Sequence, residues 1–299
     1  MDGQQIEVTL EDERTVAQVV AAINSWVVDN GMAIAALRVD DRELPLEQIG
    51  GHDSRPVDEI GEIHVETRPQ WELILSHLEL VSGFLQQWHA MLTSPTPDVE
   101  SNLRLLLEEH RDLARHLQEH VELIFPGSGE APLSTVYTVT GDPQQMLTPP
   151  DGTEPLVREL AALLTLLRQR IDEIRQPSRE AAVSSGLIHG MLDEVRDVSI
   201  LLQTGKDKEA MACVVRFTEV VEKLLRILPH LARTDQAFRQ RVEDSAAHGA
   251  LTEELNEPLR ELLEAFHAQD SVSIGDLLEY EIVPRIEKLL ALIPAETDG

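Results

Sequence analysis

The fold is decided by a ten-residue stretch that occurs twice in the chain. It reads VVEKLLRILP at residues 220–229 and RIEKLLALIP at residues 285–294. Each copy follows a shorter helical pattern and a polar connection, at residues 204–207 and 267–270. The sequence therefore predicts a repeated unit of a helix, a tight turn and a longer helix. Such a unit cannot bury its apolar stripe alone, so neighbouring helices must cover it.

Composition favours a helical core. The chain has 299 residues, enough for one large helical domain and a small one. Hydrophobic residues make up 42% but aromatic residues only 3%, so the core must consist of aliphatic side chains, which suit packed amphipathic helices.

The charge balance restricts the partners. Asp and Glu number 54 against 25 Lys and Arg, a formal charge of −29. Such a chain repels phosphate backbones and anionic lipid. We saw no local basic patch in the sequence, so nucleic acid and membrane surfaces are not expected as partners.

Cysteine content and hydropathy indicate a cytoplasmic protein. Cys213 is the single cysteine and has no partner for an intramolecular disulfide, which fits a reducing compartment. Residues 1–5 lack the basic and apolar segments of a secretory signal. No apolar run approaches the roughly 18 residues of a membrane helix.

Residues 1–68 have the pattern of a small α+β domain. Apolar residues alternate with polar ones at 6–10, as in a half-buried strand. Thr15 and Gln18 form a capping box that begins a helix. Three further strands follow, at 34–39, 42–44 and 62–66. This order resembles the ubiquitin-like β-grasp, which implies either a docking module or a small domain that caps one end of the helices.

The helical part begins at residue 69. Residues 69–125 predict an antiparallel helix pair, whose second helix runs unbroken from an N-cap at Asp98. The Gly- and Pro-rich segment 126–155 predicts a flexible loop without helix. Residues 156–299 predict a bundle with repeated hairpins, in which Pro177 and Pro229 end helices and Pro284 distorts one. The fold class is therefore α+β, a β-grasp-like domain followed by about eight helices.

One set of residues could hold a metal. Glu109, His116 and His120 are spaced by seven and four positions, which places them on one helix face, and such donors suit Zn or Fe. Leu113 interrupts that face, so a solvated helix flank is the interpretation we prefer. There is no phosphate-binding Gly-rich loop, nucleophile elbow or zinc-binding Cys pair, and we expect neither a cofactor nor catalysis.

Acidic residues gather near Pro284. Asp276, Glu279 and Glu281 could bind a cation or serve in acid–base chemistry. Neighbouring helical residues diverge by about 100°, however, so Glu279 and Glu281 are predicted to face solvent rather than one another.

Two resemblances concern the C-terminal hundred residues. Residues 201–211, with 276–281 and Pro284, resemble paired-helix modules of bacterial proteins of unknown function. Residues 274–280 (IGDLLEY) are similar to a stretch of the flagellin export chaperone, a small helical bundle. The second resemblance implies that the bundle wraps an amphipathic helix of a client protein.

We therefore expect a non-enzymatic cytoplasmic interaction protein or chaperone-like adaptor. Grooves between its helices would accept an amphipathic helix with basic flanks. The residues expected to line the groove are Leu277, Leu278, Tyr280, Ile282 and Ile286. Two alternatives stay open, a metal-dependent helical-bundle enzyme and a self-associating structural protein.

Overall fold

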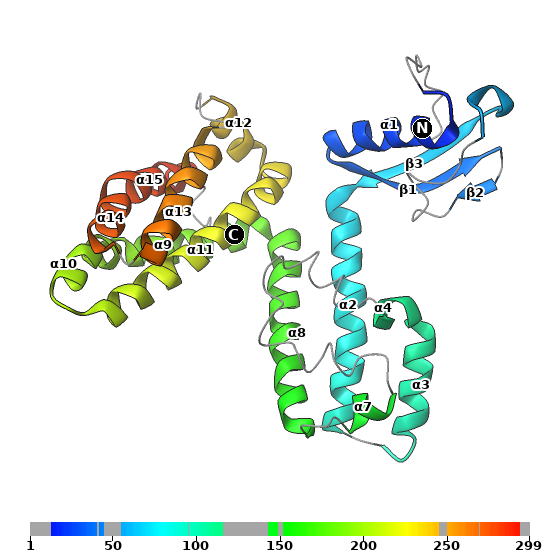
Figure 1. The fold of residues 1–299 in the computed structure, drawn as a ribbon, viewed down its shortest axis with the longest axis horizontal. Helices are drawn as coiled ribbons and strands as arrows, with labels where there is room; N and C mark the ends of the chain where they lie inside the picture. Colours follow the sequence, from blue (N-terminus) through cyan, green and yellow to red (C-terminus); the bar gives the residue numbers. More distant parts are fainter. Residues whose placement is uncertain are drawn as a thin grey trace. The chain divides into compact units, whose positions relative to one another are not determined.

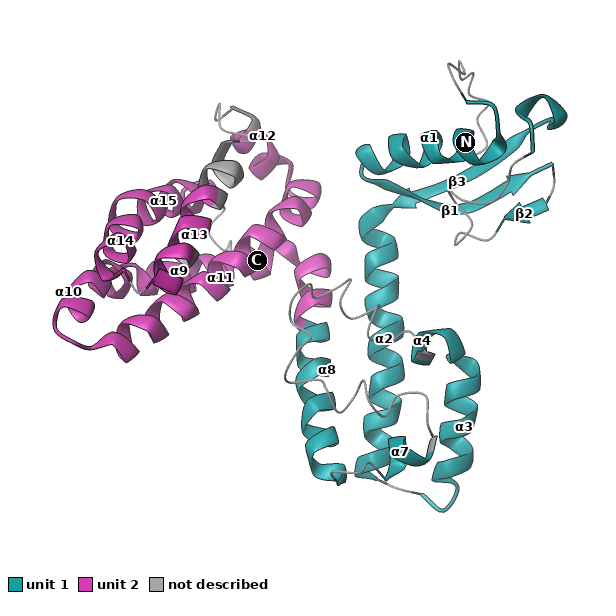
Figure 2. Ribbon diagram, in the orientation of Figure 1, with its two compact units in different colours: residues 1–168 teal, residues 169–299 magenta. Residues whose placement is uncertain are grey.

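A computed structural model of the chain describes residues 13–40, 42–44, 55–94, 96–115, 143–148, 152–244, 250–268 and 270–293 (Figure 1). The chain forms two compact units, residues 1–168 and 169–299 (Figure 2). A small sheet precedes a long series of helices, which confirms the predicted α+β class.

One helix packs on a sheet at the start of unit 1. Helix α1 (Val16–Asp29) begins at the predicted capping box, in which Thr15 accepts the Gln18 N–H and Gln18 accepts the Thr15 N–H. The described strands are β1 (Met32–Val39), β2 (Arg42–Leu44) and β3 (Ile63–Pro69), in the antiparallel order β2-β1-β3. A short 3₁₀ turn, η2 (Val57–Glu59), precedes β3. The predicted strand at 6–10 lies outside the described residues. Aliphatic side chains form the core of this layer: Val16, Val20, Val27, Ile34, Leu37, Val39 and Val65.

The predicted helix pair is broken in its second member. Helix α2 (Gln70–Thr93) matches the first helix, but the second divides into α3 (Val99–Glu109) and α4 (Arg111–Arg115). The break falls at His110, whose φ and ψ of −114° and 36° leave the helical region and whose ring packs edge-on against Phe84. Asp98 occupies the N-cap position but makes no side-chain capping bond.

A short helix, α7 (Pro143–Leu147), lies in the segment predicted to contain none. The Trp88 indole N–H donates to the Met146 carbonyl at 3.0 Å, and Met146 is fully buried. The prediction was wrong because this contact joins residues 58 positions apart, which no local pattern reveals. Residues 126–142 lie outside the described part.

Of the two prolines predicted to end helices, Pro177 marks a helix boundary and Pro229 does not. Helices α8 (Thr153–Arg175) and α9 (Pro177–Arg196) meet at Gln176, which takes the N-cap position of α9, with Pro177 in the first turn. Helix α11 (Asp207–Thr234) continues through Pro229 to Thr234. Leu231, beyond the proline, is fully buried, so tertiary packing extends the helix past the missing donor.

The predicted tight turn before α11 is present. It follows α10 (Val198–Gln203) and closes as a Schellman motif, with Gly205 at a φ of 74°. The Gly205 N–H donates to the Leu202 carbonyl and the Lys206 N–H to the Leu201 carbonyl. These bonds satisfy carbonyls at the end of α10, and glycine tolerates the left-handed conformation that they require.

The last helices are α12 (Gln236–Asp244), α13 (Ala250–Ala268), α14 (Ser271–Asp276) and α15 (Val283–Leu290). A π-helical segment, η3 (Leu277–Ile282), joins α14 to α15 and ends next to Pro284. This segment confirms the predicted distortion, because a proline removes a backbone donor and a π turn re-registers the remaining hydrogen bonds. The described helices are shorter and more numerous than the eight expected.

The two copies of the repeat contribute to one core in unit 2. Val221 and Leu224 in α11 correspond to Ile286 and Leu289 in α15, and all four side chains are buried. Helix α9 packs along α11, and α10 packs against α14. The repeated pattern therefore encodes matching buried faces.

Candidate functional site

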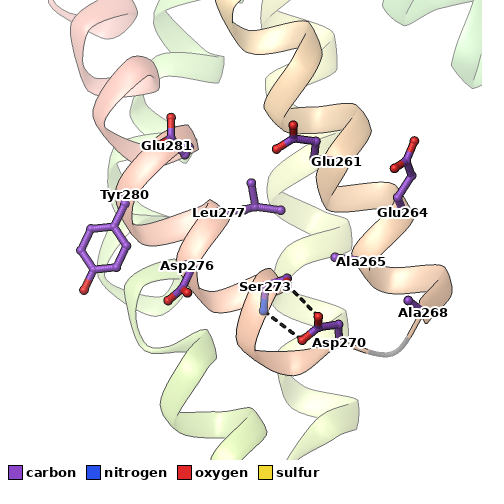
Figure 3. A pocket seen from close by; sticks show the side chains of 10 residues that line it. All are labelled: Glu261, Glu264, Ala265, Ala268, Asp270, Ser273, Asp276, Leu277, Tyr280 and Glu281. Carbon is purple, nitrogen blue, oxygen red and sulfur yellow. Dashed lines mark hydrogen bonds between the residues drawn. The ribbon is translucent and has the colours of Figure 1, made fainter.

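An open groove lies between α13 and the α14–η3 segment in unit 2 (Figure 3). Its volume is about 580 Å³. Its lining combines carboxylates with small and apolar side chains: Glu261, Glu264, Ala265, Ala268, Asp270, Ser273, Asp276, Leu277, Tyr280 and Glu281.

Asp270 fixes a negative charge at one end of the groove. Its carboxylate accepts the backbone N–H groups of Val272 and Ser273, both at 3.1 Å, and caps α14. The Ser273 hydroxyl donates to the same carboxylate at 2.8 Å. The Ser273 hydroxyl and backbone bonds lower the pKa of Asp270, so the carboxylate stays ionised at neutral pH.

Carboxylates line both sides of the groove. Glu261 and Glu264 are three positions apart on α13, and Asp276 and Glu281 belong to the opposite wall. Glu281 forms a salt bridge with Arg285. Among the described residues, no salt bridge neutralises Glu261, Glu264 or Asp276. Arg260 bonds Glu257, and the charges of Glu264 and Glu261 also raise its pKa, so it offsets part of their charge. The groove still presents more carboxylates than cations to solvent.

Leu277 and the alanines supply the apolar part of the groove. Leu277 is half-buried and points from η3 towards α13, where Ala265 and Ala268 lie (Figure 3). Tyr280 is 64% exposed, and its ring points away from α13 (Figure 3). Its hydrogen bond to Glu279 and the negative charge of that residue raise the pKa of Tyr280, so the phenol stays neutral.

The structure corrects the expected groove. Leu278, Ile282 and Ile286 are at most 1% exposed and belong to the core of unit 2, so they line no open surface in this structure. Leu277 and Tyr280 do lie at the groove. Residues at helical spacing have the same sequence pattern whether they face their own core or a partner. The sequence therefore could not separate the buried residues from the exposed ones among the five expected to line the groove.

The alternative metal site falls mostly outside the described residues. Glu109 ends α3, but His116 and His120 are not described. Within the described ranges, no three His, Cys, Asp or Glu side chains lie close enough to share a metal ion. In the same ranges, no helix has the length and apolarity to cross a membrane.

Sequence reasoning missed a basic region. Residues 223–241 contain five Lys or Arg residues and one acidic residue, Asp235. The structure brings this stretch beside the end of α8, where Arg226 lies 3.5 Å from Glu173 and Arg233 donates to the Ile174 carbonyl at 3.0 Å. Lys223 pairs with Glu180 at 2.7 Å and Arg226 with Glu173, so the stretch is basic in sequence but partly neutralised in the structure, and the expectation about partners stays a prediction. Counting charges in short windows would have found the stretch, although not its contact with α8.

Two family matches cover separate parts of the chain. Residues 183–291 match a domain of unknown function (DUF8042), and residues 1–69 match the TP0873 N-terminal domain. The first spans α9 to α15 and contains the groove, and the second ends at the last residue of β3. No curated protein and no solved structure matches the chain. The predicted similarity to proteins of unknown function is confirmed at the level of these domain families.

Proposed function

We propose that this chain is a non-catalytic cytoplasmic adaptor, similar to a chaperone, whose groove binds an amphipathic helix of a partner protein. The observation that supports this most is the combination of a partly apolar surface at Leu277 with carboxylates that no salt bridge neutralises. A partner helix with apolar residues on one face and Lys or Arg beside them complements both features.

The two features act differently in binding. Cover of Leu277 and Ala268 removes apolar surface from water and supplies affinity. Glu261, Glu264 and Asp276 attract basic flanks, which increases the association rate and excludes acidic competitors. Because the carboxylates are exposed, binding should weaken as salt concentration rises.

The test compares two pairs of neutralised carboxylates. Glu261→Gln/Glu264→Gln removes two groove charges, whereas the control Glu219→Gln/Glu222→Gln removes two from an exposed part of α11. Proteins captured from lysate by each full-length variant are quantified by mass spectrometry. The same variants are titrated with a synthetic amphipathic helix that has lysine flanks.

Exposed ion pairs contribute about 0.5 kcal/mol each, so the groove variant should bind the peptide roughly fivefold more weakly. The control variant should bind as the wild type does. Equal capture and equal peptide affinity for both variants would show that the groove is not the binding site.

Elemental analysis of the purified chain separates this function from the metal-dependent enzyme that Glu109, His116 and His120 would form. The adaptor requires no metal. Stoichiometric Zn, Fe or Mn in the full-length protein, lost on substitution of His116, would contradict the proposal.

A further inference from the structure

Helix α9 leaves one face open to solvent. Its opposite side, with Ile188, Leu192 and Val195, is buried in the core of unit 2. The open face includes Val183, which is 43% exposed, and Leu187 beside it is 53% exposed. Residues three or four positions apart lie on the same side of a helix, so these two form one apolar surface.

Two glycines lie in the middle of this face. Gly186 and Gly190 are exposed, and a Cβ atom added to either would meet nothing within 4 Å. Glycine inside a helix is costly relative to alanine, and no described part of the chain comes close enough to require it here. Small residues four positions apart allow the backbone of a second helix to approach closely.

The two ends of the face carry opposite charges. Arg179 and Asp197 are exposed, and neither forms a salt bridge with another described residue. Arg179 only donates to the side-chain oxygen of Gln176, at 3.3 Å. The acidic residues of α9 that lie nearer the glycines or beside Arg179 are paired: Glu180 with Lys223, Asp193 with Arg196 and Glu194 with Arg216.

These residues are arranged symmetrically about position 188. Gly186 and Gly190 are each two positions from it, and Arg179 and Asp197 are each nine positions from it, about 13.5 Å along the helix. The 18 positions between Arg179 and Asp197 make five turns of about 3.6 residues, so the two side chains leave the helix in the same direction. A contact between identical surfaces requires this self-complementary arrangement.

We infer that two copies of this chain pair through the open faces of their α9 helices, in an antiparallel contact with two-fold symmetry. The glycines of each copy admit the helix of the other, and Val183 and Leu187 lose exposure to water. Arg179 of each copy then lies opposite Asp197 of the other, so two salt bridges form. A helix of an unrelated protein would require no such symmetry in α9.

This contact uses none of the residues that line the groove, so it does not depend on the proposed adaptor function. One helix pair buries less area than a standard interface, and the association should therefore be weak and reversible. The excess negative charge of the chain opposes it, and about 0.15 M salt, with a Debye length of about 8 Å, limits that repulsion.

The first test reverses the end charges in the full chain and measures association by sedimentation velocity at about 0.15 M salt. Arg179→Asp and Asp197→Arg each remove two salt bridges and create two like-charge contacts. Each exposed pair changes affinity by a factor of about 2.3, so either variant alone should associate roughly thirtyfold more weakly. An equimolar mixture of the two should regain the wild-type affinity, because opposite charges meet again at both ends. The control Lys208→Asp, exposed on α11, should associate as the wild type does.

The second test fills the space between the helices. Gly186→Leu/Gly190→Leu should abolish association, whereas the control Ala162→Leu, exposed on α8, should not change it. Thermal unfolding followed by circular dichroism should show the glycine variant to be at least as stable as the wild type, because the new side chains meet no described atom and leucine favours helix.

Three results would overturn the inference. They are a wild type that remains a monomer at up to about 1 mM chain, a glycine variant that associates like the wild type, and a mixture of the charge variants that associates no more tightly than each alone. A different protein that binds a monomeric wild type and is lost with Gly186→Leu/Gly190→Leu would also overturn it, and would assign the face to that protein.

Discussion

Substitution of Gly275 tests how closely α10 and α14 approach. A Cβ atom added at Gly275 would lie 2.8 Å from the Ser199 Cβ and 3.5 Å from the Ser199 Cα. Carbon atoms in favourable contact are about 3.5–4.0 Å apart, so one helix must move by roughly 1 Å. Because the obstructing atom adjoins the backbone, rotation of a flexible side chain cannot relieve the clash.

Two opposing effects set the change in the free energy of unfolding for Gly275→Ala. Overpacking in a well-packed site costs about 1–3 kcal/mol, and Gly→Ala in a helix gains about 1 kcal/mol from propensity. Gly275→Ala should therefore lower the free energy of unfolding by about 2 kcal/mol, taking the cost at the upper end because backbone must shift. The matched control is Gly190→Ala in α9, where an added Cβ meets nothing within 4 Å. That variant should gain about 1 kcal/mol.

The assay must report on unit 2, because all three tryptophans lie in residues 1–168. Native-state hydrogen exchange of α10 and α14 is suitable, supported by urea unfolding followed by circular dichroism. The double variant Ser199→Gly/Gly275→Ala removes the closest atom, so the two substitutions should couple favourably by about 2 kcal/mol. Equal stabilities for Gly275→Ala and Gly190→Ala would refute the close approach.

Three further predictions concern stability. Trp88→Phe removes the donor to the Met146 carbonyl and leaves a small cavity, so α7 should exchange amide hydrogens faster, with a loss of about 1–3 kcal/mol. Thr15→Ala disrupts the capping box with Gln18 and should lower the free energy of unfolding of the sheet domain by about 1 kcal/mol, measured by thermal or urea unfolding. The control Ser25→Ala, at an exposed position of the same helix, should lower it by less than about 0.5 kcal/mol. Burial raises the pKa of Glu173 above its ordinary value of 4.5, against the opposing charge of Arg170. The folded state therefore binds this proton more readily, and stability contributed by Glu173 should increase as pH falls from neutrality towards 4.5. The non-titrating Glu173→Gln variant should lack this increase in paired urea unfolding series at pH 7 and pH 5, and identical pH dependence of the two proteins would contradict it.

Local signals in the sequence predicted the parts of the fold that depend on a few adjacent residues. The capping box at Thr15, the turn at Gly205 and the distortion beside Pro284 are all present. Each depends on contacts within about one helical turn, so its pattern can be read without knowledge of the rest of the chain. The acidic residue types near Pro284 were also evident. Four of the groove residues were named on that basis or as expected binders, namely Asp276, Leu277, Tyr280 and Glu281.

Other features depend on distant contacts and were missed. The sequence did not reveal α7, because the hydrogen bond from Trp88 to the Met146 carbonyl stabilises that helix. It also did not reveal that α11 continues through Pro229. Nor did it show that α13 supplies one wall of the groove, or that Arg233 of α11 reaches the Ile174 carbonyl of α8.

The sequence by itself therefore determined where helices carry apolar stripes, how several of them begin and turn, and that the chain has a large acidic excess. Tertiary structure alone decided which side of each stripe is covered, so that Leu278, Ile282 and Ile286 lie in the core while Leu277 borders solvent. The physical reason is that helical periodicity records the direction of a side chain on its own helix. Burial depends on what the other helices place opposite it.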